Sequence, residues 1–173
     1  MKEIYLKELN LKTFTEQDAS DYCQINNLYP DNITKLDFSW NKLTDISGIK
    51  IFKNTERIYL YNNQIADISV LKYLNNLKTL VLNDNNKIKD ISVISNLNKL
   101  ENLDLSYNNE IKDISVIKDL NKLKILRIEN LELESDQIQY IKSLKNLHRL
   151  WCRKGFKDMK VLNKIYKNIE IYD

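Results

Sequence analysis

Few residues of this chain have the types and spacing that catalysis needs. The 173 residues include one histidine, two cysteines and two glycines. His148 and Cys152 lie four residues apart, and an imidazole beside a thiol can activate it as a nucleophile. The sequence contains no second histidine, no Cys-x-x-Cys pair and no glycine-rich phosphate loop. The acids Glu132 and Glu134 lie close together, but nothing in the sequence distinguishes them from ordinary solvent-exposed acids. We therefore expect no enzymatic activity, no bound metal and no cofactor.

Side chains that suit the binding of another protein are more numerous. Tryptophan, tyrosine and arginine carry much of the binding energy at protein interfaces. The candidate partner-binding residues combine these types with acidic ones: Trp40, Tyr59, Tyr61, Asp84, Asp104, Tyr107, Arg127, Glu129, Trp151 and Arg153. Both tryptophans of the chain are among them. Whether they form one site depends on the elements that would bring them onto one surface.

Those elements are indicated by a repeated phrase. NNKIKDISVI at residues 85–94 returns as NNEIKDISVI at residues 108–117, an offset of 23 residues. The aligned units begin at Leu36, Ile58, Leu80 and Leu103, in steps of 22, 22 and 23 residues. A period in this range with the pattern L-x-x-L-x-L-x-x-N is typical of leucine-rich repeats. Each unit then forms a short strand, a turn and a 3₁₀ or irregular helical return.

One such unit cannot bury its apolar side alone, so the units are expected to stack. We predict an α/β solenoid, a leucine-rich repeat horseshoe. Short parallel strands would lie on the concave face, 3₁₀ or irregular returns on the convex face, and a helical cap at the N-terminus. The chain is predicted to be a single domain over residues 1–173, with a cap at 1–32, regular repeats at 33–130, and irregular repeats and a cap at 131–173.

The recurring polar residues of the repeated phrase are interpreted as structural residues that hold the repeats together. One residue of each unit could satisfy backbone groups at the turn after the strand and form a ladder along the stack: Asn41, Asn63, Asn85 and Asn108. An aspartate precedes Ile-Ser in each unit, and its side chain is expected to accept backbone N–H bonds at the start of the return. These aspartates are Asp45, Asp67, Asp90 and Asp113.

The two ends of the chain depart from the regular pattern. A strand around Ile4 and Leu6 and a helix over 15–27 are predicted at the front. A longer return over 132–147 contains helical spacing after a Ser135 or Asp136 cap, and 156–162 echoes the repeated phrase. Strands are expected at Leu150 and Cys152 and at Ile169 and Ile171. Cys152 would then point into the core, which argues against a dyad with His148.

Strand positions between the core leucines are expected to face the concave side, where the repeat does not dictate residue type. The first column is Lys35, Arg57, Thr79, Asn102, Ile125 and Arg149. The second is Asp37, Tyr59, Val81, Asp104, Arg127 and Trp151. The third is Ser39, Tyr61, Asn83, Ser106, Glu129 and Arg153, and just beyond it lie Trp40, Asn62, Asp84, Tyr107 and Asn130.

Large aromatic side chains on a solvent-facing surface exceed what the fold requires. The alternative is that Trp40 and Trp151 pack against neighbouring turns or the terminal caps. The charges are also polarised along the stack. Acids lie toward its front, at Asp37, Asp84 and Asp104, and arginines toward its back, at Arg127, Arg149 and Arg153. This pattern fits a partner of mixed charge better than a uniform polyanion.

With its residues aligned in this way, the sequence resembles the bacterial leucine-rich repeat proteins of the internalin type. The resemblance rests on four units that carry a phrase like N-x-I-x-D-I-S-x-L. It covers residues 33–130 closely and 131–173 less closely. It implies a protein that binds other proteins through its concave strand face. The signal peptide and cell-wall segment of surface internalins are not seen in this sequence.

We therefore expect a protein–protein interaction module that acts as a small intracellular regulator, inhibitor or immunity-type protein. The alternative is a host-directed internalin-like effector or adhesin that is exported without an ordinary signal peptide. Nucleic acid is not an expected partner, because the net charge is only +3 and the lysines do not line one stripe. No membrane span is expected, since no apolar run approaches ~18 residues. Two distant free thiols, Cys23 and Cys152, favour the cytoplasm, and we expect a monomer when the protein is free.

Overall fold

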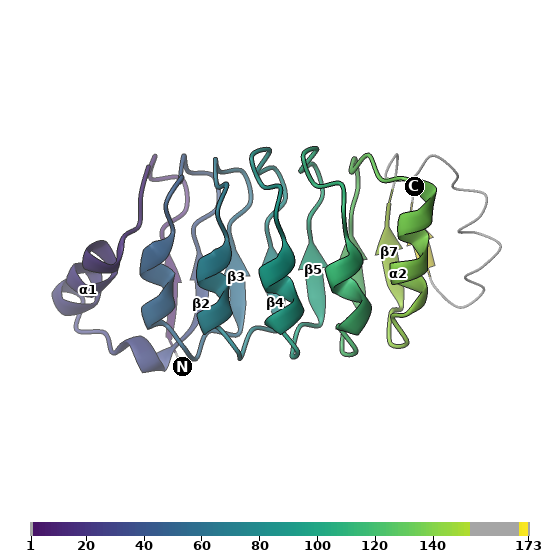
Figure 1. Cartoon of the computed structure of the whole chain (residues 1–173). Helices are drawn as coiled ribbons and strands as arrows, with labels where there is room; N and C mark the ends of the chain where they lie inside the picture. Colours follow the sequence, from purple (N-terminus) through teal and green to yellow (C-terminus); the bar gives the residue numbers. More distant parts are fainter. Residues whose placement is uncertain (1, 153–169, 173) are drawn as a thin grey trace.

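The chain forms a one-dimensional stack of strands and helical returns. The computed structural model describes residues 2–152 and the backbone of residues 170–172. Within them, eight parallel strands make one open sheet in which the strands follow chain order (Figure 1). The strands are β1 (Lys2–Tyr5), β2 (Ile33–Asp37), β3 (Arg57–Tyr59), β4 (Thr79–Val81), β5 (Asn102–Asp104), β6 (Ile125–Arg127), β7 (Arg149–Trp151) and β8 (Glu170–Tyr172). The predicted α/β leucine-rich repeat solenoid is confirmed.

Helical segments lie on the other side of the stack, in front of the strands in Figure 1. The α-helices are α1 (Glu16–Ile25) and α2 (Ile138–Lys142). The 3₁₀ helices are η1 (Pro30–Asn32), η2 (Ser47–Ile51), η3 (Ser69–Tyr73), η4 (Ser92–Asn96), η5 (Ser115–Asp119) and η6 (Ser135–Gln137). We call the outer surface of the sheet the strand face and the opposite surface the return face.

The core lies between these two layers. Strand residues at one position of each repeat are fully buried, namely Leu36, Ile58, Leu80, Leu103, Leu126 and Leu150. The position two residues later is buried in the same way and includes Cys152. The register pairs each buried leucine or isoleucine with its equivalent in the next repeat, for example Leu80 with Leu103. Cys152 is therefore a core residue as predicted, whereas His148 is exposed. Cys23 and Cys152 are both buried free thiols.

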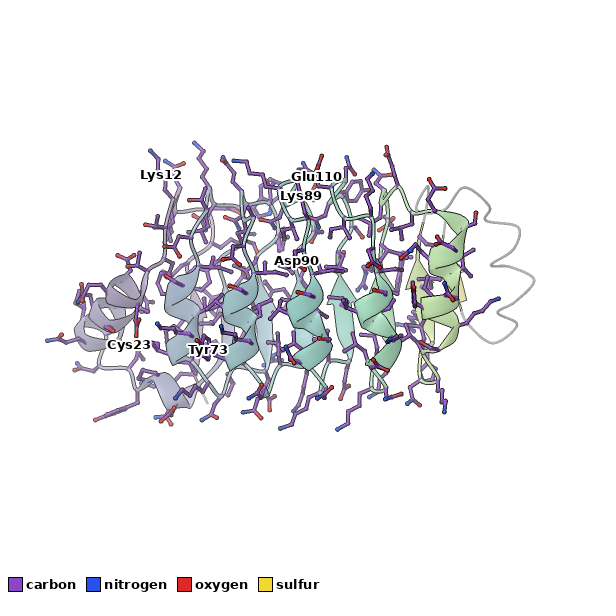
Figure 2. All side chains as sticks on the ribbon, viewed as in Figure 1. Lys12, Cys23, Tyr73, Lys89, Asp90 and Glu110 are labelled. Atoms are coloured by element: carbon purple, nitrogen blue, oxygen red, sulfur yellow. The ribbon has the colours of Figure 1, made fainter. Side chains whose placement is uncertain are left out.

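Each regular return begins with the predicted aspartate. A carboxylate oxygen accepts the backbone N–H of the serine two residues later, as in Asp67 with Ser69 (2.7 Å) and Asp90 with Ser92 (2.8 Å). Asp45 and Asp113 make the same bond. This bond also lowers the pKa of Asp90 below its ordinary value. Figure 2 shows Asp90 at the start of its return and Tyr73 on η3. The capping role predicted for these aspartates is confirmed.

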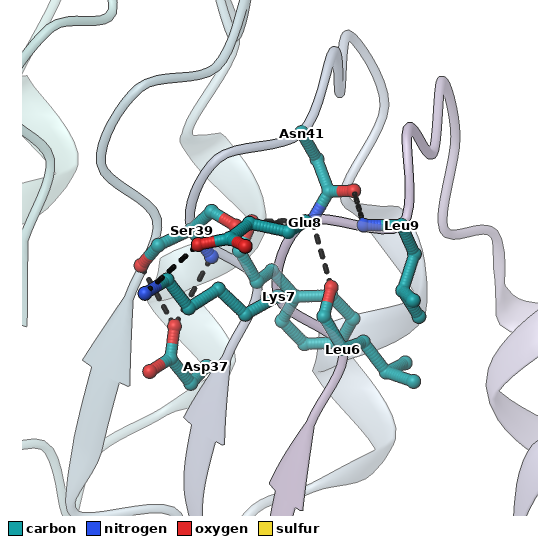
Figure 3. Close-up of polar contacts among 8 residues, drawn as sticks. Leu6, Lys7, Glu8, Leu9, Asp37, Ser39 and Asn41 are labelled. Carbon is teal, nitrogen blue, oxygen red and sulfur yellow. Dashed lines mark hydrogen bonds and ion pairs between the residues drawn. The ribbon is translucent and has the colours of Figure 1, made fainter.

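The predicted asparagine ladder is also confirmed. Asn85 is fully buried, and its amide group donates to the carbonyls of Leu60 and Leu82, both at 2.9 Å. Its Oδ1 accepts the N–H of Ile65 (3.1 Å). Asn41 extends the ladder to the cap, where it accepts from Leu9 (3.0 Å) and donates to Leu6 (2.7 Å), as Figure 3 shows. These side chains join successive repeats where the backbone leaves the sheet.

The N-terminal cap closes the first repeat with aromatic and backbone contacts. Helix α1 begins at a capping box in which Thr15 and Asp18 exchange hydrogen bonds. The ring of Phe14 lies 4.5 Å from that of Phe38, centroid to centroid, inside the core. The N–H of Gly48 donates to the carbonyl of Phe14 (2.8 Å). The predicted front strand is present as β1, which pairs with β2.

The prediction for the long return at 132–147 was partly wrong. A helical turn is present at η6 and α2, and Ile138 and Ile141 are buried as expected. The cap positions of η6 and α2 are Glu134 and Gln137 instead of Ser135 or Asp136, and neither makes a side-chain cap hydrogen bond. Instead, Gln137 Oε1 accepts the N–H of Ile114 in the preceding repeat (3.0 Å). The repeated phrase predicted at 156–162 and Ile169 lie outside the described residues.

Candidate protein-binding face

The sheet register places the first two predicted columns on the strand face. Lys35, Arg57, Thr79, Asn102, Ile125 and Arg149 are consecutive partners in the sheet. So are Asp37, Tyr59, Val81, Asp104, Arg127 and Trp151. All twelve residues are partly or fully accessible, while the leucines between the columns are buried. Side chains distant in the sequence are thus brought side by side.

The third column differs from the prediction. Ser39 and Ser106 are buried, at 0% and 2% exposure. The Ser39 hydroxyl donates to Asp37 (2.7 Å), and the Ser106 hydroxyl oxygen accepts the N–H of Glu129 (3.1 Å). The reason is that the strands end two residues earlier, so the alternation of a strand no longer applies. Tyr61, Asn83 and Glu129 remain half-buried, and Arg153 lies outside the described residues.

Arg127 and Trp151 form a preorganised pair at the back of the strand face. The guanidinium of Arg127 lies 4.2 Å from the centroid of the Trp151 ring. Its Nη1 also donates to Asn102 Oδ1 (3.0 Å). A cation held over an aromatic face in this way has lost much of its rotamer freedom before any partner arrives. Trp151 therefore packs partly within the protein, as the alternative interpretation proposed, but against another candidate residue.

The front of the strand face carries an ion and aromatic cluster that the sequence did not reveal. Lys35 Nζ lies 4.5 Å from the Tyr5 ring and 5.2 Å from the Tyr59 ring. Glu3 pairs with Arg57 (3.2 Å) and lies near Lys35 (3.8 Å). The acids predicted toward the front therefore share it with two cations, Lys35 and Arg57, which belong to the first predicted column. The alternating side chains of β1 could have predicted this cluster, because the register places Glu3 beside Lys35 and Tyr5 beside Asp37.

A groove of about 440 Å³ runs along the amino-terminal ends of the strands. Residues that precede successive strands line it with alternating charge, namely Glu56, Lys78, Glu101 and Lys124. Lys78 pairs with Glu56 and Lys124 with Glu101, each at 2.8 Å. The Lys124 ammonium lowers the pKa of Glu101 below its ordinary value. These paired charges recur at the repeat spacing. That recurrence is visible in the sequence, but the three predicted columns did not include these residues.

Asp104 is a carboxyl of the strand face whose pKa is shifted by burial. Burial raises its pKa above the ordinary value of 3.8, although hydrogen bonds from Ser106 and the charge of Arg127 act in the opposite direction. The nearby charge of Asp84 adds to the increase. Because burial disfavours its ionised form, Asp104 lowers the stability of the folded protein at neutral pH. A cationic partner that neutralises the carboxylate would remove this destabilisation on binding.

Replacement of Asp104 with asparagine is expected to raise the melting temperature at pH 7 by about 2 °C, corresponding to less than about 1 kcal/mol. The folded-state pKa is raised, so wild-type stability falls as pH increases from the unfolded value to the folded one. The difference between variant and wild type should therefore disappear below pH 3.8, measured by thermal unfolding across pH. A variant that is less stable at pH 7 and gains at low pH would contradict this sign.

The described residues contain no group of three or more histidine, cysteine or acidic side chains that could hold a metal ion. Among these residues, no helix has both the length and the apolar character needed to cross a bilayer. The accessible side chains of the first two columns include aromatic and charged ones, which are suited to contact with a macromolecule.

Comparison with known proteins agrees with the repeat geometry. Residues 56–99 match the family model described as leucine-rich repeats (2 copies), and residues 31–52 and 96–118 match the model of a leucine-rich repeat. An internalin (inlF) from Listeria monocytogenes superposes with a TM-score of 0.74 at 28% identity. The chain is a leucine-rich repeat protein with internalin-like repeats. That alignment covers 82% of this chain and 41% of the internalin.

Other solved structures support the fold of this leucine-rich repeat protein. Internalin C2 from Listeria monocytogenes has a TM-score of 0.77 at 21% identity, over 99% of this chain and 73% of its own. A plant peptide hormone receptor, RGFR1 in complex with RGF2, has a TM-score of 0.67 at 16% identity, over 98% of this chain and 32% of its own. No curated protein matches the sequence. Leucine-rich repeat proteins of this kind generally mediate protein–protein interaction.

Proposed function

We propose that this protein binds another protein through its strand face and has no catalytic activity. The observation that carries the proposal is the set of aromatic and arginine side chains at positions the repeat leaves free. Tyr59, Arg127 and Trp151 occupy one column of the sheet, where the regular scaffold requires no particular residue. Such side chains are enriched among residues that dominate binding energy. The preformed Arg127–Trp151 contact reduces the entropy lost on binding.

The cellular role that we propose is that of a small cytoplasmic regulator, inhibitor or immunity-type protein, monomeric when free. Its two buried free cysteines support a reducing compartment. A second role, that of an exported host-directed effector or adhesin, is favoured by the likeness to the Listeria internalin, of which this chain spans 41%. Recovery of the protein outside intact cells would favour the second role, and recovery only from the cytosol would remove it.

A strand-face variant with Tyr59→Ala, Tyr61→Ala and Arg127→Ala is expected to lose its partner. Removal of hot-spot side chains usually costs about 2 kcal/mol or more each, so affinity should fall at least about a hundredfold. The measurement is affinity capture of partners from an extract of the organism of origin, followed by titration with the purified partner. Circular dichroism verifies that the variant is folded.

The matched control removes an aromatic residue and two cations from the return face: Lys72→Ala, Tyr73→Ala and Lys118→Ala. Tyr73 is 46% exposed there, so its loss should leave both fold and binding nearly unchanged. Retention of the partner by the strand-face variant together with its loss by the control would contradict the proposed mode of binding.

A further inference from the structure

A row of residues with left-handed backbone conformation borders the strand face at the carboxyl ends of the strands. We call this row the carboxyl-end rim; it consists of Glu8, Trp40, Asn62, Asp84, Tyr107 and Asn130, with φ angles of 60°, 57°, 56°, 58°, 60° and 59°. Their amides bond to the adjacent repeat, as in Trp40 to Tyr61 (2.9 Å), Asn62 to Asn83 (3.0 Å) and Asp84 to Ser106 (3.1 Å). The rim residues therefore lie side by side in this order, and Figure 3 shows Glu8 at its start.

Three members of the rim have side chains that this backbone does not favour, and two of them are aromatic. Asparagine and aspartate tolerate the left-handed conformation, whereas most other residues pay roughly 1–2 kcal/mol for it. Asn62, Asp84 and Asn130 follow the preference, but Glu8, Trp40 and Tyr107 do not. Both aromatic side chains are also exposed, at 51% and 41%. Trp40 touches Tyr61 edge to face at 6.1 Å between ring centroids, which fixes its ring without burying it. Backbone strain combined with exposure indicates residues retained for contact with a partner.

Large and small side chains follow one another along the rim in a definite order. Between Trp40 and Tyr107 lie only the shorter side chains of Asn62 and Asp84. Three strand spacings of about 4.8 Å separate the two aromatic positions, or about 14 Å in total. We call this stretch, from Trp40 to Tyr107, the notch, and an aromatic side chain stands at each end of it. An extended polypeptide crossing it could place one long side chain between the walls.

The charge of the notch is negative. Asp84 is its acid, and Glu8 lies one position beyond Trp40. The adjacent strand face carries Asp37 near Lys7 and Asp104 near Arg127. The rim itself contains no cation, and the nearby Lys7 is paired with Glu8 (3.1 Å). Asp84 Oδ2 accepts from the amide of Asn83 (2.9 Å), which orients the carboxylate without neutralising it. Carboxylates between exposed aromatic faces complement an arginine or lysine, through both charge and cation–π attraction.

We propose that the carboxyl-end rim binds an extended segment of the partner, with an arginine or lysine side chain seated between Trp40 and Tyr107 over Asp84. This inference rests on the proposed function and specifies the chemistry of its partner. It assigns Trp40 and Tyr107 as walls and Asp84 as the charge that selects a cation. Tyr59, Arg127 and Trp151 are left to contact the remainder of the partner.

The test is selection of a displayed random dodecapeptide library on the wild-type protein, followed by fluorescence anisotropy with the selected peptides. We expect peptides enriched in arginine or lysine. Asp84→Asn should weaken them about tenfold, as expected for loss of one interfacial charge pair. Trp40→Asn and Tyr107→Asn should each weaken them about thirtyfold while leaving thermal stability unchanged or higher, because asparagine suits the left-handed backbone.

Asp119→Asn is the matched control, since Asp119 is an exposed acid at the end of η5 on the return face. It should leave peptide affinity unchanged. Peptides that bind without cationic enrichment, or that Asp84→Asn does not weaken, would overturn the inference and leave the proposed function standing. A selection that yields no peptide dependent on Trp40 or Tyr107 would also overturn it. Failure of the proposed function is recognised separately, by partner capture that survives the triple strand-face variant.

Discussion

Replacing Asn85 with alanine is expected to lower the free energy of unfolding by about 3 kcal/mol or more. The fully buried side chain accepts the N–H of Ile65 and donates to the carbonyls of Leu60 and Leu82. Alanine removes the acceptor from a buried N–H, which costs about 1–3 kcal/mol, and also removes hydrogen bonds worth about 1 kcal/mol each. The loss falls in the middle of the stack, where it uncouples two repeats.

Urea unfolding followed by circular dichroism measures this effect. Asn86→Ala is the matched control, since Asn86 is the exposed neighbour of the ladder residue, and its replacement should change stability by no more than about 0.5 kcal/mol. Equal stabilities for the two variants would show that the ladder does not hold the repeats together as described.

The second large effect is expected from Gly48→Val, which destabilises the junction between the cap and the first repeat by about 3 kcal/mol. A Cβ atom at Gly48 would lie 2.2 Å from the carbonyl oxygen of Thr15 and 2.7 Å from that of Phe14. Both contacts are with backbone, so no side-chain rotation relieves them. Valine is the natural residue at the equivalent positions of later returns, Val70, Val93 and Val116, where no cap approaches.

Thermal unfolding and limited proteolysis check this prediction. In the Gly48→Val variant, cleavage within residues 6–32 should become faster than in wild type, because the cap is displaced from η2. Val93→Ala, a truncation at the equivalent place in η4, should cost less than about 1.5 kcal/mol and leave the cap protected. Slow cleavage together with unchanged stability of Gly48→Val would refute the close approach of cap and return.

The parts of the structure that repeat were predictable from the sequence. Recurrence at 22 or 23 residues determines which side chains stack, so Asn63 and Asn85, or Tyr59 and Arg127, could be assigned without coordinates. The same comparison could have explained Gly48, since glycine replaces valine only in the unit beside the cap. That inference required knowledge that residues 13–15 pass over η2, a contact between segments more than 30 residues apart.

Features at the edges of the strands were less predictable. The strand alternation was extended two residues too far, which placed Ser39 and Ser106 on the surface although they are buried. The left-handed rim had a compositional signal in Asn62, Asp84 and Asn130, but Trp40 and Tyr107 concealed it. The cluster of Glu3, Tyr5 and Lys35 depended on the pairing of β1 with β2, which no repeat specifies.

The central claim is that a protein partner covers the strand face, and hydroxyl-radical footprinting of the complex tests it most directly. Exposed aromatic side chains are available both on the rim of the strand face and away from it. Trp40 and Tyr107 on the rim are 51% and 41% exposed, and Tyr73 on η3 and Tyr29 within the cap are 46% and 74% exposed. We predict that partner binding suppresses oxidation of Trp40, Tyr61 and Tyr107 and leaves Tyr73 and Tyr29 as reactive as in the free protein. Protection of Tyr73 or Tyr29 with no protection on the strand face or its rim would contradict the account.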